Sequence, residues 1–254
     1  MNFLPRRMFL LAPLVSAAVL SACGGSDTED RLDVADPVVR FVHASPLAPN
    51  VTLYRDAAAQ TNATNVPYKF ASNYFDVSTS SALWSVKTAV GNAVVGEEVI
   101  NPSRGNKYTI VALPASNTAS SIYVIRDPYN KSLTSDKAKL RIMNASFNAS
   151  NIDFYLNAVG TDIAAAGVNP SIAATAYKTS GPASGNDSLD INAGTYQIVM
   201  ATAATKQVLF KGTIVIEKNK DILLLTVPDT VLPGAIQTLM KIEGTAGCTD
   251  VPAS

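Results

Sequence analysis

The sequence predicts an all-β protein made of two tandem Ig-like β-sandwich domains, and three observations lead to that prediction. Short apolar segments rich in Val, Ile, Thr, Tyr and Phe recur along the chain, separated by Asn, Pro, Gly and Ser. No long apolar stripe at helical spacing interrupts these segments. A stretch near the start of the chain returns in similar form about a hundred residues later, which is the spacing of tandem domains.

The first copy is expected in residues 37–130 and the second in residues 137–246, each able to fold alone. The expected strands of the first are 38–43, 50–55, 68–77, 83–89, 93–100, 107–113 and 121–126. Those of the second are 138–144, 151–156, 171–177, 187–191, 195–203, 207–217, 221–227 and 236–243. About seven short strands in about a hundred residues are typical of a β-sandwich.

The repeat is clearest where "RFVHASPLAPNVTLYRD" aligns without gaps on "RIMNASFNASNIDFYLN". Arg40 meets Arg141, Tyr54 meets Tyr155, and His43 meets Asn144. A second anchor pairs "KYTIVALPA" with "TYQIVMATA". The same order of matching apolar positions in both halves indicates two related domains.

The composition supports folded domains and argues against a nucleic-acid-binding surface. Apolar residues make up 47% of the 254 residues and charged residues 16%, which is enough apolar material for real cores. Lysine plus arginine equals aspartate plus glutamate, with 20 of each. No net field therefore draws the protein to nucleic acid.

Residues 1–22 have the layout of a secretory signal peptide: two arginines, a short apolar run, then small residues. The run is too short to span a membrane. The end of this segment, "LSAC", resembles the lipobox of bacterial lipoproteins. The resemblance implies cleavage between Ala22 and Cys23, a diacylglycerol on the Cys23 thiol, and, with Gly24 next, retention at the outer membrane. The alternative is an ordinary signal peptide, with Sec or twin-arginine export left open.

Residues 23–36 then form a flexible acidic tether, because Gly, Ser and acidic residues follow one another without an apolar period. Lipidation of Cys23 would leave Cys248, in the C-terminal tail, either as a free thiol or, as the alternative, in an intermolecular disulfide. The expected location is the cell envelope, with the protein facing the periplasm or the cell surface.

The segment "VRFVHASPLAPNVTLYRD" resembles the opening signature of a bacterial envelope family, domain of unknown function 4397. The residues that carry the resemblance are Arg40, His43, Ala44, Ser45, Pro46, Ala48, Pro49 and Tyr54. The resemblance implies extracytoplasmic β-rich proteins, often lipid-anchored, of unassigned activity. The second copy departs from the pattern, because Asn144, Phe147 and Ser150 replace the histidine and the two prolines.

The sequence contains little that points to catalysis. His43 is the only histidine, and a hydrolase would have to use it with a nucleophile such as Ser45. No Gly-x-Ser-x-Gly motif is present, and Asn144 cannot titrate, so we expect the His43 motif to be structural.

One histidine and one remaining cysteine do not make a zinc site, and the acidic loop around Asp187 and Asp190 lacks the spacing of a calcium loop. No cofactor or metal is expected. Five aromatic residues of the first copy could form either a ligand platform or core: Tyr68, Phe70, Tyr74, Phe75 and Trp84.

These observations predict a lipid-anchored envelope protein with a binding, adhesion or structural role and no catalysis. The membrane, through the N-terminal lipid, and an envelope polysaccharide or protein are the partners that fit such a role. The alternative function is an envelope hydrolase, or a hydrolase accessory domain, that uses His43.

Overall fold

The computed structural model describes residues 35–114, 121–129, 135–149, 151–232 and 234–254. Strands dominate these residues, and the only helical element among them is a 3₁₀ turn at Thr61–Ala63. The prediction of an all-β sandwich protein is therefore confirmed. A search of the same residues found no helix with the length and apolarity that crossing a membrane requires. The signal peptide, Ala22, Cys23 and nearly all of the tether lie outside the described residues.

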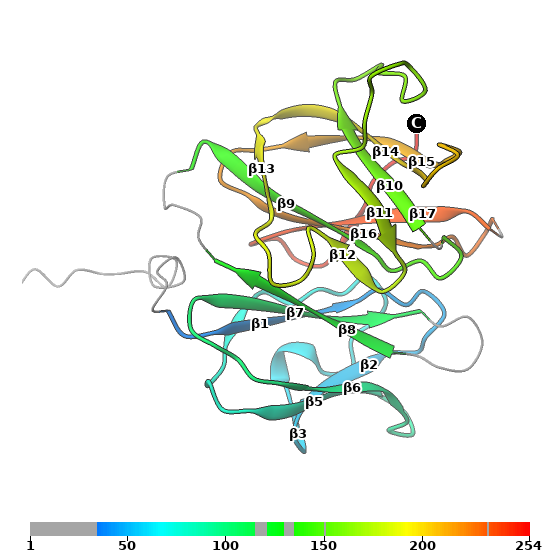
Figure 1. Ribbon diagram of the computed structural model, residues 1–254. Helices are drawn as coiled ribbons and strands as arrows, with labels where there is room; N and C mark the ends of the chain where they lie inside the picture. The colour runs from blue at the N-terminus through cyan, green and yellow to red at the C-terminus, as the bar shows by residue number, and fades with distance from the viewer. Residues whose placement is uncertain (1–34, 115–120, 130–134, 150, 233) are drawn as a thin grey trace, which may run out of the picture.

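The first sandwich occupies the lower half of the molecule in Figure 1 and consists of two four-stranded sheets. Sheet A has the order β4-β1-β7-β8, with β1 and β7 parallel, and sheet B has the order β3-β2-β5-β6. Their bounds are β1 Val38–His43, β2 Val51–Arg55, β3 Ala58–Ala59, β4 Phe75–Asp76, β5 Ala82–Thr88, β6 Val94–Ile100, β7 Asn106–Leu113 and β8 Ser121–Pro128. The expected long strand over 68–77 is reduced to β4 and one isolated bridge at Ala71.

The second sandwich forms the upper half of Figure 1. Sheet C has the order β12-β9-β16-β17-β18, with β13 also paired to β9, and sheet D has the order β11-β10-β14-β15. Their bounds are β9 Lys137–Asn144, β10 Asn151–Asn157, β11 Ile172–Ala176, β12 Thr179–Gly181, β13 Leu189–Asn192, β14 Gly194–Thr202, β15 Val208–Ile216, β16 Asp221–Pro228, β17 Ile236–Ile242 and β18 Thr249–Asp250. The pair β9 and β16 is parallel.

The two sandwiches share one strand order, which makes the main strands equivalent in pairs: β1 with β9, β2 with β10, β5 with β14, β6 with β15, β7 with β16 and β8 with β17. This order corrects the second anchor of the sequence alignment. The segment "KYTIVAL" is β7, which pairs with β1 in sheet A, whereas "TYQIVMAT" belongs to β14, which pairs with β10 in sheet D. The true counterpart of β7 is β16, "DILLLTVP", because β16 runs parallel to β9 as β7 does to β1.

Each sandwich has its own core, and a third apolar layer joins the two. Side chains such as Phe41 and Trp84 fill the space between sheets A and B, while Phe154 and Leu224 lie between sheets C and D. The outer faces of sheets A and C pack against each other, in a layer that we call the seam. The buried seam residues are Val42, Ala44, Ala71, Val111, Leu113, Ile125, Met143, Ala145, Leu223, Leu225, Val227 and Leu239.

The seam explains why β7 is buried at every position, since both faces of sheet A are covered. The C-terminal segment adds a further bond between the halves, because the Lys69 ammonium lies 2.7 Å from the Asp250 carboxylate. Cys248 donates its backbone N–H to the Lys69 carbonyl at 2.8 Å, so this tail is not a loose end. Burial raises the pKa of the Cys248 thiol to about 11, which keeps the thiol protonated.

Candidate binding site in the seam

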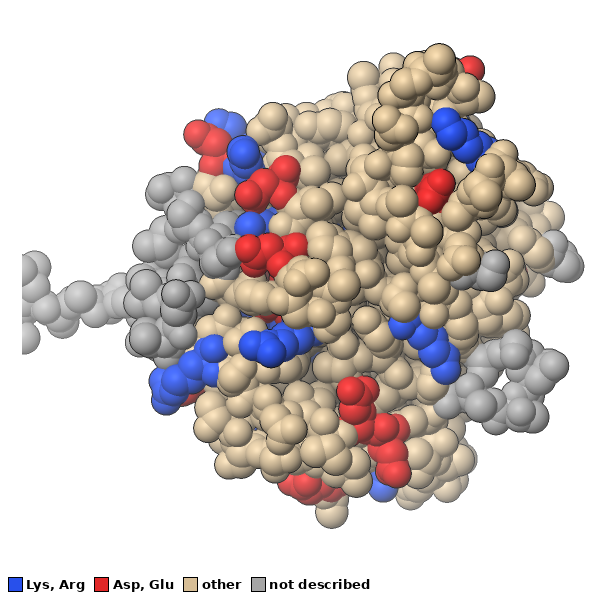
Figure 2. Space-filling view, viewed as in Figure 1, with Lys and Arg blue, Asp and Glu red and all other residues tan. Residues whose placement is uncertain are grey.

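Charged side chains occupy one end of the seam and apolar side chains occupy the rest. Seam-facing residues recur at every second position of a strand, so each strand can change character along its length. Arg40 precedes Val42 on β1, and Lys139 and Arg141 precede Met143 on β9. Figure 2 shows Lys and Arg side chains interleaved with Asp and Glu along the boundary between the sandwiches. This charged end is the part of the seam where water or a ligand can compete with protein contacts.

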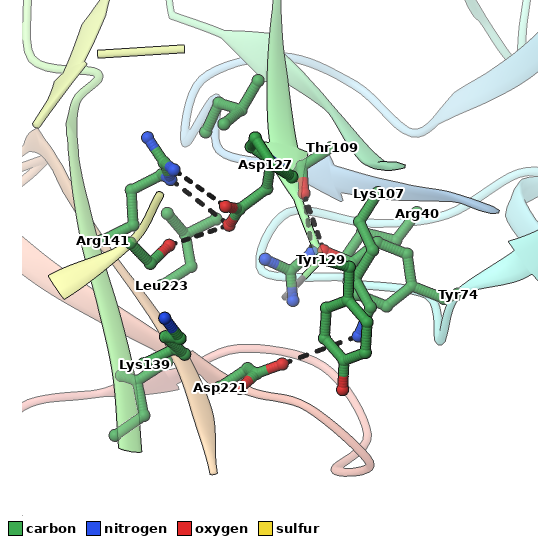
Figure 3. Close-up of a pocket in the computed structure, with 14 residues that line it drawn as sticks. Arg40, Tyr74, Lys107, Thr109, Asp127, Tyr129, Lys139, Arg141, Asp221 and Leu223 are labelled. Carbon is green, nitrogen blue, oxygen red and sulfur yellow. Dashed lines mark hydrogen bonds and ion pairs between the residues drawn. The ribbon is translucent and has the colours of Figure 1, made fainter. Parts of the chain in front are cut away.

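A cavity of about 30 Å³ lies at the charged end, between the two sandwiches. Its walls come from β1, β7 and β8 on one side and from β9 and β16 on the other (Figure 3). The volume gives room for two or three water molecules at about 10–15 Å³ each. The ionisable side chains of its wall include Arg40, Lys107, Asp127, Lys139, Arg141 and Asp221.

Arg141, on β9, has a full set of partners. Its guanidinium crosses the seam to the Asp127 carboxylate on β8, with Nη2 at 2.9 Å from Oδ1. The same group donates to the backbone carbonyls of Pro182, Ala183 and Asn186. A second oxygen of Asp127 accepts from the Ser188 hydroxyl at 2.8 Å. Arg141 is therefore a paired charge that joins the two sandwiches.

Lys107, on β7, is the centre of a second buried ion-pair group. Its ammonium lies 2.6 Å from Glu243 Oε1 and 3.5 Å from Asp221 Oδ2, and 3.5 Å from the centre of the Tyr129 ring. Burial raises the pKa of Glu243, and a hydrogen bond with Asp221 raises it further, while the Lys107 charge opposes both. Two neighbouring carboxyl groups thus share one cation, a condition that favours a proton on one of them.

Arg40, on β1, lacks such partners. Its Nε donates to the Thr109 hydroxyl at 2.9 Å, and its guanidinium carbon lies 4.7 Å from the centre of the Tyr74 ring. Among the residues that the structure describes, no carboxylate is within ion-pair distance of Arg40, although the residue is only 6% exposed. In Figure 3 its terminal nitrogens point into the open middle of the cavity.

The shared strand order shows which partner Arg40 is missing. Arg40 and Arg141 are equivalent, and the strand registers make Asp127 and Glu243 equivalent as well. Arg141 binds Asp127 across the seam, but Glu243 is bound by Lys107 instead of Arg40. Lys107 occupies the position that Asp221 occupies in the second sandwich, and Glu243 pairs with this lysine and not with Arg40.

The loop after β1 is held by His43, which is fully buried. The Ser45 backbone N–H donates to Nδ1 at 3.3 Å, which leaves Nε2 to carry the proton and donate to the Pro49 carbonyl at 3.2 Å. Burial lowers the pKa of the ring, so it stays neutral, and the bond to Pro49 opposes that shift only in part. Both ring nitrogens are used by the backbone.

Asn144 holds the equivalent loop of the second sandwich in the same way. Its Oδ1 accepts the Ser146 backbone N–H at 3.1 Å, and its Nδ2 donates to the Ala149 carbonyl at 2.7 Å. An amide oxygen has a second lone pair, which accepts the Thr226 hydroxyl at 2.9 Å. The position equivalent to Thr226 is Ala112, which has no hydroxyl to donate. This suits His43, because Nδ1 has a single lone pair and Ser45 already uses it.

Residues 37–155 match the model of the family described as domain of unknown function DUF4397. The DUF4397 match covers the first sandwich and continues through β9 to Tyr155 in β10, so it includes both Arg40 and Arg141. No curated protein matches the chain.

Among solved structures, the chain is similar to CBMbc (family CBM26) from Eubacterium rectale Amy13K, solved in complex with maltoheptaose. The two are 8% identical, with a TM-score of 0.23, and the similarity covers 83% of this chain and 97% of that one. A similarity this weak says nothing about a ligand of the present protein.

The motif residues at the start of the DUF4397 match have different surroundings. Ala44 and Ser45 are buried under the loop, Pro46 and Tyr54 are half-buried, and Pro49 is exposed and offers its carbonyl to His43. The Ser45 hydroxyl makes no hydrogen bond with the imidazole, since only its backbone N–H reaches Nδ1. His43 and Ser45 are therefore not arranged as a base and a nucleophile.

The five clustered aromatic residues of the first sandwich do not form an exposed platform. Trp84 is fully buried, and Phe70 and Phe75 pack against the first core. Tyr68 packs against the seam, and Tyr74 lies beneath Arg40. These five residues belong to the core, the seam and the cavity wall. Of the two interpretations that the sequence allowed, a ligand platform or core, the structure supports core.

No cluster of three or more metal-ligating His, Cys, Asp or Glu residues occurs in the described ranges. The acidic loop has a different role, since Asp190 lies 3.2 Å from the Lys139 ammonium at the cavity.

Sequence reasoning found Arg40 as a motif residue but missed Lys107, Lys139, Asp127 and Glu243 as its neighbours. One signal was available, because β7 and β16 are mostly apolar after a charged residue near their start, a pattern that indicates burial on both faces. A charged residue at the start of such a strand marks the edge of a buried interface.

Proposed function

We propose that this protein is a lipid-anchored binding protein of the bacterial cell envelope that performs no catalysis. The observation that carries the proposal is the cavity at the seam, where a buried arginine faces open space of about 30 Å³. Such a space admits a small charged group but not a sugar ring or a peptide bond with its flanking residues.

A hydrolase that uses His43 receives no support from the geometry. A general base needs a free nitrogen within reach of the proton it removes. The ring of His43 is enclosed, and both nitrogens are engaged by Ser45 and Pro49. We therefore assign His43 a structural role, as the pin of the loop between β1 and β2.

The second sandwich is proposed to be another copy of the domain that the DUF4397 model matches. The shared strand order supports this proposal, as does the equivalent use of His43 and Asn144 to hold the loop after the first strand. The copies have diverged at the seam, where Lys107 and Asp221 occupy equivalent positions with opposite charge.

The anchor is proposed from the lipobox "LSAC" and the acidic tether that follows. We expect Cys23→Ser to release the protein from membranes, because a body with balanced charge offers no electrostatic attachment and stable anchoring takes two signals, which the two acyl chains of the diacylglycerol would supply. The measurement is fractionation of cells that express either form, followed by a salt wash. A mutant that still sediments with the membranes would contradict the proposed anchor.

Absence of catalysis is tested with a panel of ester, peptide and glycoside substrates on the mature protein and on His43→Asn. We expect no turnover by either protein. Turnover by the mature protein that disappears in His43→Asn, at an unchanged melting temperature, would establish the hydrolase instead.

A further inference from the structure

We propose that the cavity in the seam binds a carboxylate group of a ligand through the guanidinium of Arg40. This inference deepens the proposed binding function and rests on it. It names the chemical class that the site takes: a small oxyanion, with a carboxylate favoured over phosphate or sulfate.

Arg40 is a buried charge without an ionic partner among the described residues. A cation removed from water is destabilising unless ionic and hydrogen-bonding partners replace the lost hydration. Arg40 keeps one side-chain hydrogen bond, to Thr109, and stacks on Tyr74. Its two terminal nitrogens carry four N–H groups that the described residues leave without an acceptor. An oxyanion in the cavity would supply the missing acceptors at short range.

Arg141 shows what kind of partner an arginine takes at this position of the repeat. The equivalent arginine of the second sandwich binds a carboxylate, that of Asp127, and does so from across the seam. The fork of a guanidinium matches the two oxygens of a carboxylate, and this geometry is available to Arg40 as it is to Arg141. The carboxylate equivalent to Asp127 is Glu243, which Lys107 holds at 2.6 Å. A carboxylate from outside would therefore complete the pattern.

The charge and the size of the site also fit a carboxylate. The cations around the cavity outnumber the carboxylates by one: Arg40, Lys107, Lys139, Arg141 and Lys241 against Asp127, Asp190, Asp221 and Glu243. Burial lowers the pKa of Lys241, and the neighbouring charge of Arg40 lowers it further, while Cys248 and Glu243 raise it. Room for two or three water molecules fits a carboxylate head group.

The site is also connected to the surface. The Lys139 side chain is 15% exposed, and its partner Asp190 is 50% exposed. A carboxylate that enters past this pair would have Arg40 ahead of it and would leave the rest of its molecule outside. The Tyr74 ring and the Thr109 hydroxyl fix the orientation of the guanidinium before a ligand arrives, which reduces the entropy that binding has to offset.

The experiment is thermal unfolding of the mature protein at pH 7 in 100 mM sodium acetate, with 100 mM acetamide plus 100 mM sodium chloride as the neutral isostere at equal ionic strength. For a dissociation constant on the order of 10 mM, acetate should raise the melting temperature by about 3 °C and acetamide should not. Arg40→Gln should remove the acetate effect. Arg55→Gln is the matched control, because Arg55 also lies beside an aromatic ring but on sheet B, away from the cavity, and should retain the effect.

Phosphate and sulfate at the same ionic strength form further arms. A larger shift with either of them than with acetate overturns the preference for a carboxylate. The site itself is overturned if acetate and acetamide plus chloride shift the melting temperature equally, or if Arg40→Gln retains the acetate shift. The comparison of acetate with acetamide needs only the unmodified protein, so it holds even if the variant does not fold. The proposed function is tested separately, by membrane fractionation and by the substrate panel. A failure of the carboxylate site can therefore be told apart from a failure of the proposed function.

Discussion

Replacing His43 by asparagine gives the first sandwich the residue that already holds the equivalent loop of the second sandwich, at Asn144. The imidazole makes two hydrogen bonds with its own loop, and a hydrogen bond within a protein contributes about 0.5–1.5 kcal/mol net. Asparagine can make both bonds, since Asn144 does so with Ser146 and Ala149. The amide is smaller than the ring and leaves one lone pair unused. We therefore expect His43→Asn to lower the free energy of unfolding by about 1–2 kcal/mol at pH 7.

His43→Ala gives the contrasting case, because the Ser45 N–H and the Pro49 carbonyl both lose their partner. An orphaned buried group costs about 1–3 kcal/mol, so this variant should lose about 2–4 kcal/mol in all. Ala112→Thr should restore part of the loss in His43→Asn, because Thr226 donates to Asn144 at the equivalent position. The double variant should show a favourable coupling of about 0.5–1.5 kcal/mol between the two substitutions.

The His43 variants also predict a pH dependence. Burial lowers the pKa of His43 below its ordinary value of 6.5, so the unfolded chain binds a proton before the folded chain does. The neutral ring contributes stability that is present above pH 6.5 and is lost as the pH falls through the folded pKa. His43→Asn has no imidazole to protonate and so does not lose this stability at low pH. The difference in free energy of unfolding between the unmodified protein and His43→Asn should therefore shrink on going from pH 7 to pH 5.

Urea denaturation followed by tryptophan fluorescence measures these free energies, since Trp84 is fully buried in the first core. A deficit in His43→Asn above about 4 kcal/mol, or one that stays constant from pH 7 to pH 5, would refute the assignment of His43 as a neutral loop pin.

Three further predictions concern the seam. Arg141→Gln should cost about 2–4 kcal/mol, because it removes the guanidinium from the half-buried Asp127 carboxylate and from three backbone carbonyls, whereas Arg40→Gln should cost less than about 1 kcal/mol; equal costs in urea denaturation would contradict the contrast between the two arginines. The pKa of Glu243 is raised in the folded chain, so the folded chain keeps this proton to a higher pH than the unfolded chain does, and the free energy of unfolding should fall as the pH rises from 4.5 through the folded pKa. Glu243→Gln should flatten the dependence of the free energy of unfolding on pH in this range, and an unchanged slope would count against the shared proton. Residues 37–128 alone would expose the apolar face of sheet A, at a cost on the order of 10 kcal/mol, so this half should not melt cooperatively as a monomer in calorimetry; a sharp monomeric transition would show that the seam is dispensable.

The sequence supported the fold class well because alternation and turn residues are local signals. Most expected strands lie within two residues of the observed ones, as in β1, predicted over 38–43 and found at Val38–His43. The failures have a common cause in tertiary context. The stretch 68–77 has strand-like residues, but Tyr74 and Phe70 are drawn to the cavity and the core, and only Phe75–Asp76 pairs as a strand.

The alignment error at the second anchor has a related physical origin. "TYQIVMAT" shares a tyrosine and an Ile-Val pair with "KYTIVAL", but β14 is exposed at its start, whereas β7 is buried throughout. The better guide was the mostly apolar composition of β16, a strand that is covered on both faces as β7 is. Independent folding of the halves was inferred from length alone, and the seam could be inferred only by asking what covers the second face of those runs.

The candidate site was out of reach of sequence reasoning for a different reason. Arg40 and Arg141 occupy the same position of a repeat and differ only in what lies opposite them. The partner of each is set by pairing across four strands, and the outcome turns on Lys107 standing where its counterpart is Asp221. No local pattern reports which of two cations the half-buried Glu243 will bind.

The central claim, that Arg40 is an open cation prepared for an anionic group while Arg141 is already satisfied, can be tested residue by residue. The measurement is a titration of the ¹⁵N-labelled mature protein with acetate, following the guanidinium Nε–Hε signals of both arginines by NMR, with Arg40→Lys and Arg141→Lys to assign them. The account predicts that the Arg40 signal moves along a saturable curve while the Arg141 signal, held by Asp127, stays in place. An Arg40 signal that does not move, or two signals that move together, would contradict it.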